Sequence, residues 1–110
     1  MKLTPEERTW RDAYCQELAR QFPDLVEEIV LFGSQARGEA GADSDLDVLV
    51  IIREGDRTKK RAVRHIGHHL AVMSEAVPSI MVYTREEWFS RRRDNSPFDR
   101  AVVSDGVRVA

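Results

Sequence analysis

Residues 29–52 read IVLFGSQARGEAGADSDLDVLVII, and the interpretation of the whole chain starts from them. Two apolar, β-branched runs, 29–32 and 46–52, predict strands, and the polar, glycine-bearing stretch between them predicts a connecting turn. The run 48–52 is apolar without alternation, which is typical of a central strand covered on both faces. The sequence therefore predicts two strands of one sheet, joined by a polar segment.

Two carboxylates stand at the head of the second predicted strand, at Asp45 and Asp47. Because residues i and i+2 of a strand point to the same face, both carboxylates should lie on one side, with Cα atoms about 7 Å apart. Bare carboxylates at that spacing repel each other, and a hard divalent cation such as Mg²⁺ or Mn²⁺ would keep both ionised. The alternative is a pair of turn aspartates at a solvated strand end, and the upstream turn favours the metal site over it.

That upstream turn begins with Gly33, which ends the first strand, and Ser34. Glycine lets the backbone approach a ligand closely, free N–H groups in such a turn bind anions, and the Ser34 hydroxyl can add a hydrogen bond to a phosphate. Arg37 could steady the same phosphates or make a weak surface ion pair, and the sequence favours neither. A phosphate-binding turn beside a carboxylate pair predicts a nucleoside triphosphate site.

The rest of the sequence predicts helices that pack on this sheet. A threonine cap, a proline and a glutamate (Thr4, Pro5 and Glu7) begin a helix that should end near residue 21. The other expected elements are a basic amphipathic helix over 58–73 with Val63, Ile66, Leu70 and Met73 on its apolar side, a strand around Ile80 and Val82, a short helix with Trp88 and Phe89 inward, a helix over 98–105 and an extended 107–109. The expected fold class is α/β (α+β), a single domain over 1–110 with helices on one small sheet.

Cysteine content and hydropathy favour a cytoplasmic protein. The single cysteine, Cys15, cannot form an internal disulfide and is interpreted as a packing residue, which fits a reducing compartment. The longest apolar run has five residues, whereas about 20 are needed to span a bilayer. A membrane protein is therefore not expected.

Charge is distributed unevenly along the chain, whose net charge is −2. Residues 1–56 carry 13 acids and 6 bases, whereas residues 57–110 carry 6 acids and 11 bases. This balance disfavours a uniformly basic nucleic-acid binder, and no aromatic residues are interleaved with the bases at 57–64, so direct nucleic-acid binding is not expected. His65, His68 and His69 have helical spacing, but without a further ligand they are interpreted as a solvated helix face.

The spacing of the glycine, serine and aspartates resembles a known family. Gly33-Ser34, ten residues and then Asp45-Leu46-Asp47 resembles the signature of the polymerase-β nucleotidyltransferase superfamily, and Gly-Ser-x-Ala-Arg-Gly with Ser-Asp-x-Asp resembles its minimal nucleotidyltransferase branch. The resemblance implies a mixed sheet, Mg²⁺ or Mn²⁺, and transfer of a nucleoside monophosphate from an NTP, with ATP expected. It also implies a HEPN-type helical partner, for which such a protein is the antitoxin. By the same resemblance Asp45 and Asp47 are catalytic and metal-binding, and Gly33, Ser34 and Arg37 bind the nucleotide.

One position departs from the family pattern. The superfamily carries a third carboxylate on the neighbouring strand, as general base and metal ligand, and it aligns here with Ser79. A serine hydroxyl has neither the charge nor the basicity for these roles. Glu75 is a candidate substitute for the missing carboxylate, but it lies four residues upstream and is a weak one. Two hypotheses follow: a nucleotidyltransferase that modifies a hydroxyl of a partner protein, or a weakly active or inactive nucleotide-binding module that neutralises a HEPN-type partner by binding.

Overall fold

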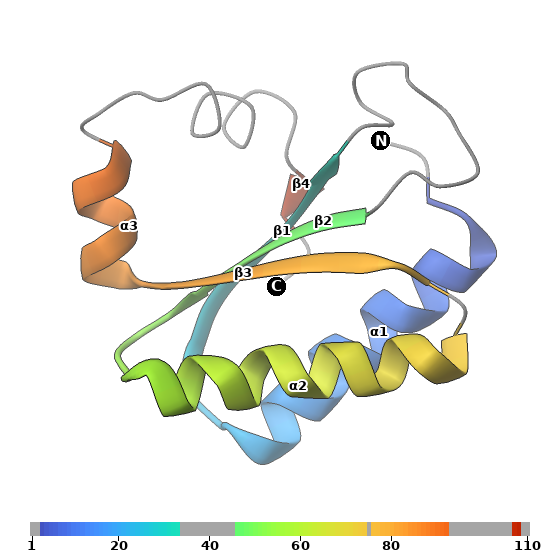
Figure 1. Cartoon of the computed structure of the whole chain (residues 1–110), viewed down its shortest axis with the longest axis horizontal. Coiled ribbons are helices and arrows are strands. Elements are labelled where there is room, and N and C mark those ends of the chain that lie inside the picture. Colours follow the sequence, from blue (N-terminus) through green and yellow to red (C-terminus); the bar gives the residue numbers. More distant parts are fainter. Residues whose placement is uncertain (1–2, 34–45, 75, 93–106, 109–110) are drawn as a thin grey trace.

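A computed structural model describes residues 3–33, 46–74, 76–92 and 107–108 of the chain (Figure 1). The elements in chain order are α1 (Pro5–Gln21), β1 (Val26–Gly33), β2 (Leu46–Ile52), α2 (Arg57–Ser74), β3 (Pro78–Thr84), α3 (Arg85–Arg92) and β4 (Val107–Arg108). They follow the predicted order, and the helix expected over 98–105 lies outside the described residues.

The described strands form one mixed sheet in the order β3-β2-β1-β4. β2 is central: it pairs antiparallel with β1 and parallel with β3, while β4 pairs antiparallel with the outer edge of β1. The interpretation of 48–52 as a central strand is confirmed, because every residue of that run is buried. This topology also confirms a mixed sheet with packed helices.

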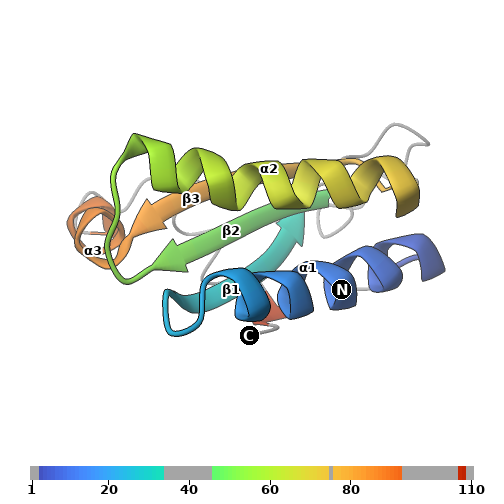
Figure 2. The ribbon, with the colours of Figure 1, turned by 90° about the horizontal axis from the view of Figure 1, so that it is seen from below.

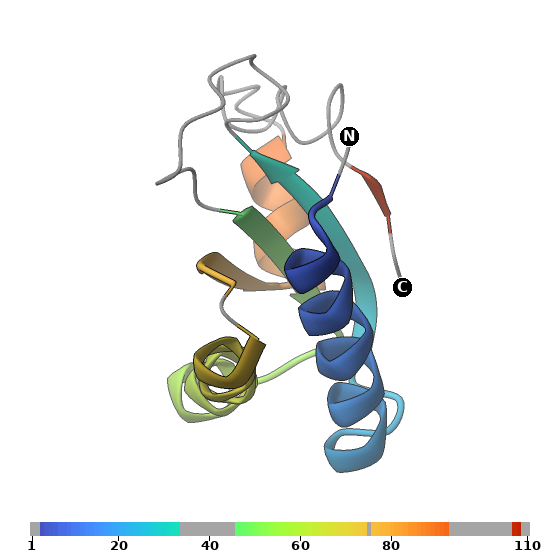
Figure 3. The same ribbon diagram turned by 90° about the vertical axis from the view of Figure 1, so that its right-hand side faces the viewer.

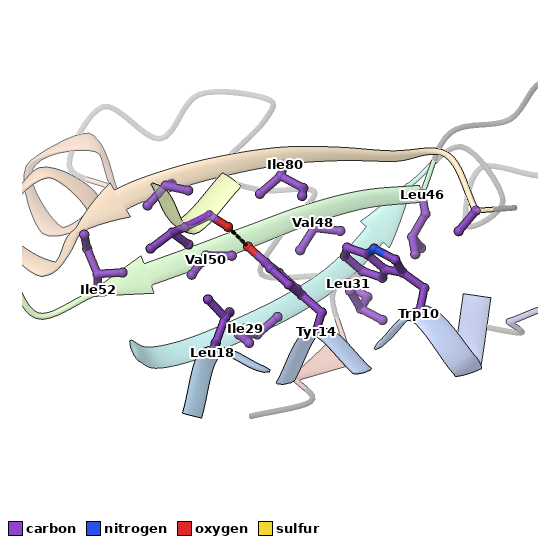
Figure 4. Packing of buried hydrophobic residues seen from close by; sticks show 13 residues of the cluster. Trp10, Tyr14, Leu18, Ile29, Leu31, Leu46, Val48, Val50, Ile52 and Ile80 are labelled. Carbon is purple, nitrogen blue, oxygen red and sulfur yellow. Dashed lines mark hydrogen bonds between the residues drawn. The ribbon is translucent and has the colours of Figure 1, made fainter. Parts of the chain in front are cut away.

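α1 and α2 lie side by side and cover one face of the sheet (Figures 2 and 3). The alternate residues of β2 that face them belong to the main core, which Figure 4 shows from close by. Leu49 and Ile51 point to the opposite face and pack in a smaller cluster with Trp88 of α3. One face of the sheet is thus covered by two long helices, and α3 packs against the opposite face.

Side chains of α1 hydrogen-bond to the backbone of α2. Trp10 Nε1 donates to the Gly67 carbonyl at 2.8 Å. The Tyr14 hydroxyl donates to the Val63 carbonyl at 2.9 Å, the bond that the dashed line marks in Figure 4. The two rings stack with centroids 4.8 Å apart, and both are fully buried. Because a buried indole N–H or phenol O–H without a partner is costly, these bonds fix the position of α2 along α1.

Two predictions of buried residues are wrong. Met73 is 78% exposed, because spacings of three and four residues from Val63 turn it about 80° around the helix, away from the sheet. Phe89 is 65% exposed, because Trp88 takes the inward position of α3 against Tyr83 and the next residue lies about 100° around that helix.

β1 begins at Val26, three residues before the predicted start. In the sequence, the two glutamates at 27 and 28 interrupt the apolar run, so the pattern does not predict a strand before residue 29. In the structure the Arg53 amide donates to the Leu25 carbonyl at 2.8 Å, and the Glu27 carboxylate pairs with Arg85. Tertiary contacts therefore extend a strand whose first residues lack an apolar pattern.

Candidate active site

Three strand ends meet at one edge of the sheet. β1 ends at Gly33, whereas β2 begins there at Leu46 and β3 at Pro78. Gly33 pairs with Leu46, and Leu46 pairs with Pro78. The turn that leaves β1 and the aspartates that enter β2 are thereby attached to adjacent strands.

Asp47 is the described member of the carboxylate pair. It pairs with Phe32 of β1 on one side and with Ser79 of β3 on the other. Its neighbours Leu46 and Val48 point into the core beneath α1 and α2, so Asp47 points to the opposite face. The side chain is half-buried, at the end of a strand that is otherwise buried.

Ser79 lies beside Asp47 on the same face of the sheet. Directly paired residues of adjacent strands project the same way, and Ile80 and Val82 alternate into the core on the other side. Ser79 is exposed. The strand neighbour of Asp47 on β3 is therefore a neutral hydroxyl.

The remaining predicted site residues lie outside the described part of the chain. They are Ser34, Arg37, Asp45 and the nearby Glu75. In the sequence Asp45 immediately precedes Leu46, the first residue of β2, and Asp47 follows as the second residue of that strand. The phosphate-binding turn remains a prediction.

The donor set fits a hard divalent cation. Carboxylate oxygens are the ligands that Mg²⁺ prefers, and Mg²⁺ is bound in proteins through one or two carboxylates together with substrate phosphates. Asp45 and Asp47 supply two carboxylates, whereas the hydroxyl of Ser79 is uncharged and does not supply a third. Within the described ranges no three His, Cys, Asp or Glu side chains gather closely enough to hold a metal.

The histidines and the cysteine stand apart from this edge. His65 and His69 are exposed on α2 with ring centroids 6.4 Å apart, in line with the interpretation as a solvated face. Burial raises the pKa of the Cys15 thiol, with Arg11 opposing that shift, so the thiolate needed for reactivity is disfavoured. Cys15 also lines a pocket of about 310 Å³ between α1 and the start of β1, at the end of that strand away from Gly33.

Comparison with known proteins decides the family. A family model described as "Nucleotidyltransferase domain" matches residues 12–101. The chain belongs to this nucleotidyltransferase family. A protein of Methanocaldococcus jannaschii named "Putative protein adenylyltransferase MJ0141" is 27% identical over 73 residues, which are 66% of this chain and 74% of that protein.

Solved structures of nucleotidyltransferases share the fold. One described as "Structure of putative minimal nucleotidyltransferase" matches with a TM-score of 0.58 and 27% identity over 93% of this chain and 91% of that chain. A complex of tri-AMPylated Shewanella oneidensis HEPN toxin with MNT antitoxin matches with a TM-score of 0.55 and 17% identity over 92% and 69%. The predicted polymerase-β-like minimal nucleotidyltransferase fold is confirmed.

Sequence reasoning missed three exposed apolar side chains near this edge of the sheet. Val72 and Met73 at the end of α2 are 83% and 78% exposed, and Val77 before β3 is 62% exposed. The Val77 carbonyl accepts a hydrogen bond from the Leu46 amide at 3.0 Å, which ties this segment to the start of β2. An apolar residue in a helical pattern carries no signal of exposure, so only the structure could reveal these side chains as exposed.

Of the described helices, none is long and apolar enough to cross a membrane.

Proposed function

We propose that this nucleotidyltransferase binds ATP with Mg²⁺ or Mn²⁺ through Gly33, Ser34, Asp45 and Asp47, with Arg37 at the phosphates. The observation that carries the proposal is the strand register, in which Asp47 stands beside the end of β1 and beside Ser79. The phosphate-binding turn and the carboxylates thus extend from neighbouring strands of one sheet edge. The reaction is transfer of AMP to a hydroxyl of a partner protein.

The residues of the chain have separate tasks in this reaction. The Gly33-Ser34 turn holds the phosphates with backbone N–H groups, and Asp45 and Asp47 hold the cation, which supplies charge neutralisation when bound. The acceptor oxygen bonds to the α-phosphorus, the bond from that phosphorus to the bridging oxygen breaks, and pyrophosphate leaves. The hydroxyl proton passes to a base, and this step is where Ser79 matters.

Ser79 lowers the expected rate of the transfer. Its hydroxyl, beside Asp47, cannot accept the acceptor's proton at neutral pH as a carboxylate would. The proton then passes to water or to a carboxylate of the partner. This observation supports the second candidate function, a nucleotide-binding module of weak or no activity that neutralises its partner by binding.

The partner in both cases is a HEPN-type helical protein. Support comes from the fold shared with the MNT antitoxin complex and from the name of the M. jannaschii relative. Both observations support the proposal that this chain is the antitoxin of a toxin–antitoxin pair. We place the pair in the cytoplasm, because the reaction uses ATP and the single cysteine suits a reducing compartment.

Nucleotide binding is tested by thermal unfolding. Mg²⁺–ATP should raise the melting temperature, because a ligand of the folded state at 100 times its Kd stabilises by about 2.7 kcal/mol. Asp45→Asn with Asp47→Asn should abolish the rise. The control, Glu6→Gln with Asp12→Asn, removes two charges from the exposed side of α1 and should keep it. No rise with any of the four NTPs, with Mg²⁺ or Mn²⁺, contradicts the proposal.

The role of Ser79 is tested by restoring a carboxylate. Ser79→Asp should raise AMP transfer to the partner by about 10² to 10⁴, the usual contribution of a positioned general base. Ser90→Asp, which adds the same charge to the exposed side of α3, should not. A Ser79→Asp protein that binds ATP normally but gains no rate shows that Ser79 is not at the position of the base.

A further inference from the structure

The outward side of α2 carries a continuous exposed stripe. α2 packs on α1 and β3 through the opposite side, where Val63 and Gly67 are buried. Residues within a sector of about 80° point away from this contact. All of them are exposed; we call them the α2 stripe: Arg57, Arg61, His65, His68 and Val72. Figure 2 looks onto the outer surface of the layer that α1 and α2 form.

The first half of the stripe carries positive charge that the described residues do not balance. α2 contains no Asp or Glu, and its bases are Arg57, Lys59, Lys60, Arg61 and Arg64. Of these five bases, only Lys60 forms an ion pair with a carboxylate of the described residues, that of Glu87 at 2.7 Å. A binding partner that faces Arg57 and Arg61 therefore needs negative charge.

The last turn of α2 is apolar. Four large hydrophobic side chains are exposed among the described residues. Three of them are Val72, at the end of the stripe, Met73 and Val77. Val72 and Met73 are adjacent in the chain, and neighbouring exposed apolar residues mark binding surfaces more often than scattered ones do. This end of α2 lies at the same end of the strands as the candidate active site, because Val77 is bonded to Leu46 and lies two residues before Ser79, while Asp47 and Ser79 face the other side of the sheet.

We infer that the α2 stripe, with Met73 and Val77, is the docking surface for the acceptor protein, an inference that rests on the proposed function. Charge complementarity sets the partner's chemistry: carboxylates opposite Arg57 and Arg61, and an apolar patch over Val72. A nucleic acid matches the basic half but offers nothing to bury the aliphatic half, so a protein is the occupant.

The stripe is basic at one end and apolar at the other, and this difference sets the direction in which the partner docks. The apolar end of the stripe lies at the end of the sheet where β2 and β3 begin, and Arg57 lies about 22 Å from Val72 along the helix. Burial of the apolar end anchors the partner at this end of the sheet, while the basic end steers its approach. Because Asp47 and Ser79 face the other side of the sheet from α2, the acceptor hydroxyl reaches the reacting phosphate around the ends of the strands.

The probe for the experiment is the HEPN-type protein encoded beside the gene for this chain, purified and titrated against the full chain by calorimetry. Arg57→Glu with Arg61→Glu should raise the Kd at least about tenfold and flatten its dependence on salt. Val72→Asp should also raise the Kd about tenfold or more by placing a charge in the apolar contact. The control, Arg8→Glu with Arg20→Glu on the exposed side of α1, should stay within about twofold.

The stripe variants must keep the rise in melting temperature that Mg²⁺–ATP gives the free chain, which shows that the fold and the nucleotide site are intact.

An unchanged Kd in both variants overturns the docking surface while the proposed function stands. If Mg²⁺–ATP does not raise the melting temperature of the wild type, the proposed function itself is overturned. The absence of a HEPN-type neighbour, or of any complex with it, overturns the partner. A wild-type dimer that Val72→Asp dissolves assigns the stripe to a second copy and also overturns the proposal. Displacement of the partner by RNA also overturns the proposal.

Discussion

Gly67 sets how closely α2 can approach the layer beneath it. A Cβ atom at this position would lie 2.3 Å from Ile80 Cδ1 and 3.0 Å from Tyr14 Cε1. The Tyr14 ring cannot yield freely, because its hydroxyl donates to Val63 and its face stacks on Trp10. The glycine is thus required by the space between helix and sheet.

Gly67→Ala should lower the free energy of unfolding by about 1 kcal/mol. Alanine gains up to about 1 kcal/mol in helix propensity over glycine, but overpacking a filled core costs about 1 to 3 kcal/mol. Urea denaturation measures the difference. In an Ile80→Val background, which lacks the Cδ1 atom, the same substitution should be neutral or stabilising. An equal cost in both backgrounds would show that the contact with Ile80 is not the cause.

α3 is an eight-residue helix that depends on its contacts. Its first turn is closed by reciprocal bonds: the Glu87 amide donates to the Thr84 hydroxyl at 3.1 Å, and the Thr84 amide donates to the Glu87 carboxylate at 2.9 Å. Lys60 of α2 donates to the same carboxylate. Beyond that turn, Arg91 lies over the Tyr83 ring, 5.5 Å from its centroid. Glu87 therefore joins α3 to both β3 and α2.

The pKa of Glu87 is held below its ordinary value of 4.5, first by the hydrogen bond from Lys60 and then by the Thr84 amide. A lowered folded-state pKa contributes stability that is present above pH 4.5 and is lost as the pH falls through the folded value. Glu87→Gln should therefore cost less than about 1 kcal/mol at pH 7, since the pair is partly exposed, and the gap to wild type should close toward pH 3.

Urea denaturation across this pH range measures that gap, and Glu86→Gln is the control, because Glu86 is exposed on the same turn. A gap of constant size between pH 7 and pH 3 would show that the charge of Glu87 contributes nothing.

At the scale of the whole molecule, the sequence predicted what depends on local patterns. The uninterrupted apolar run of β2 marked it as central, and the capping residues of α1 marked its start at Pro5. Met73 and Phe89 were misplaced, because exposure at a helix end depends on which part of the sheet lies beneath it. Local patterns give the element, while the surrounding fold decides which of its sides is covered.

The candidate site, too, has a part that the sequence predicts and a part that needed the structure. The prediction that Asp45 and Asp47 share a face needs only local geometry, since i and i+2 share a face in any strand, and Asp47 is the member of the pair that the structure describes. The pairing of Asp47 with Ser79 needed the register of two strands separated by a helix, and only the family alignment suggested it before the structure placed them side by side. The basic helix over 58–73 was predicted from the sequence as a candidate partner surface, but which of its side chains face outward needed exposed fractions.

The last prediction concerns how the whole fold opens. β2 is hydrogen-bonded to strands on both sides and is buried from Val48 to Ile52, so its amides should exchange with solvent only when the entire domain unfolds. Native-state hydrogen exchange should give these amides an opening free energy equal to that from urea denaturation, about 5 to 15 kcal/mol for a domain of this size. The amides of Val72 and Met73, at the exposed end of α2, should exchange through smaller openings. If the β2 amides also exchanged at a free energy well below the global value, the sheet would open separately from its helices. The bonds from Trp10 and Tyr14 to α2 would then not couple the two layers.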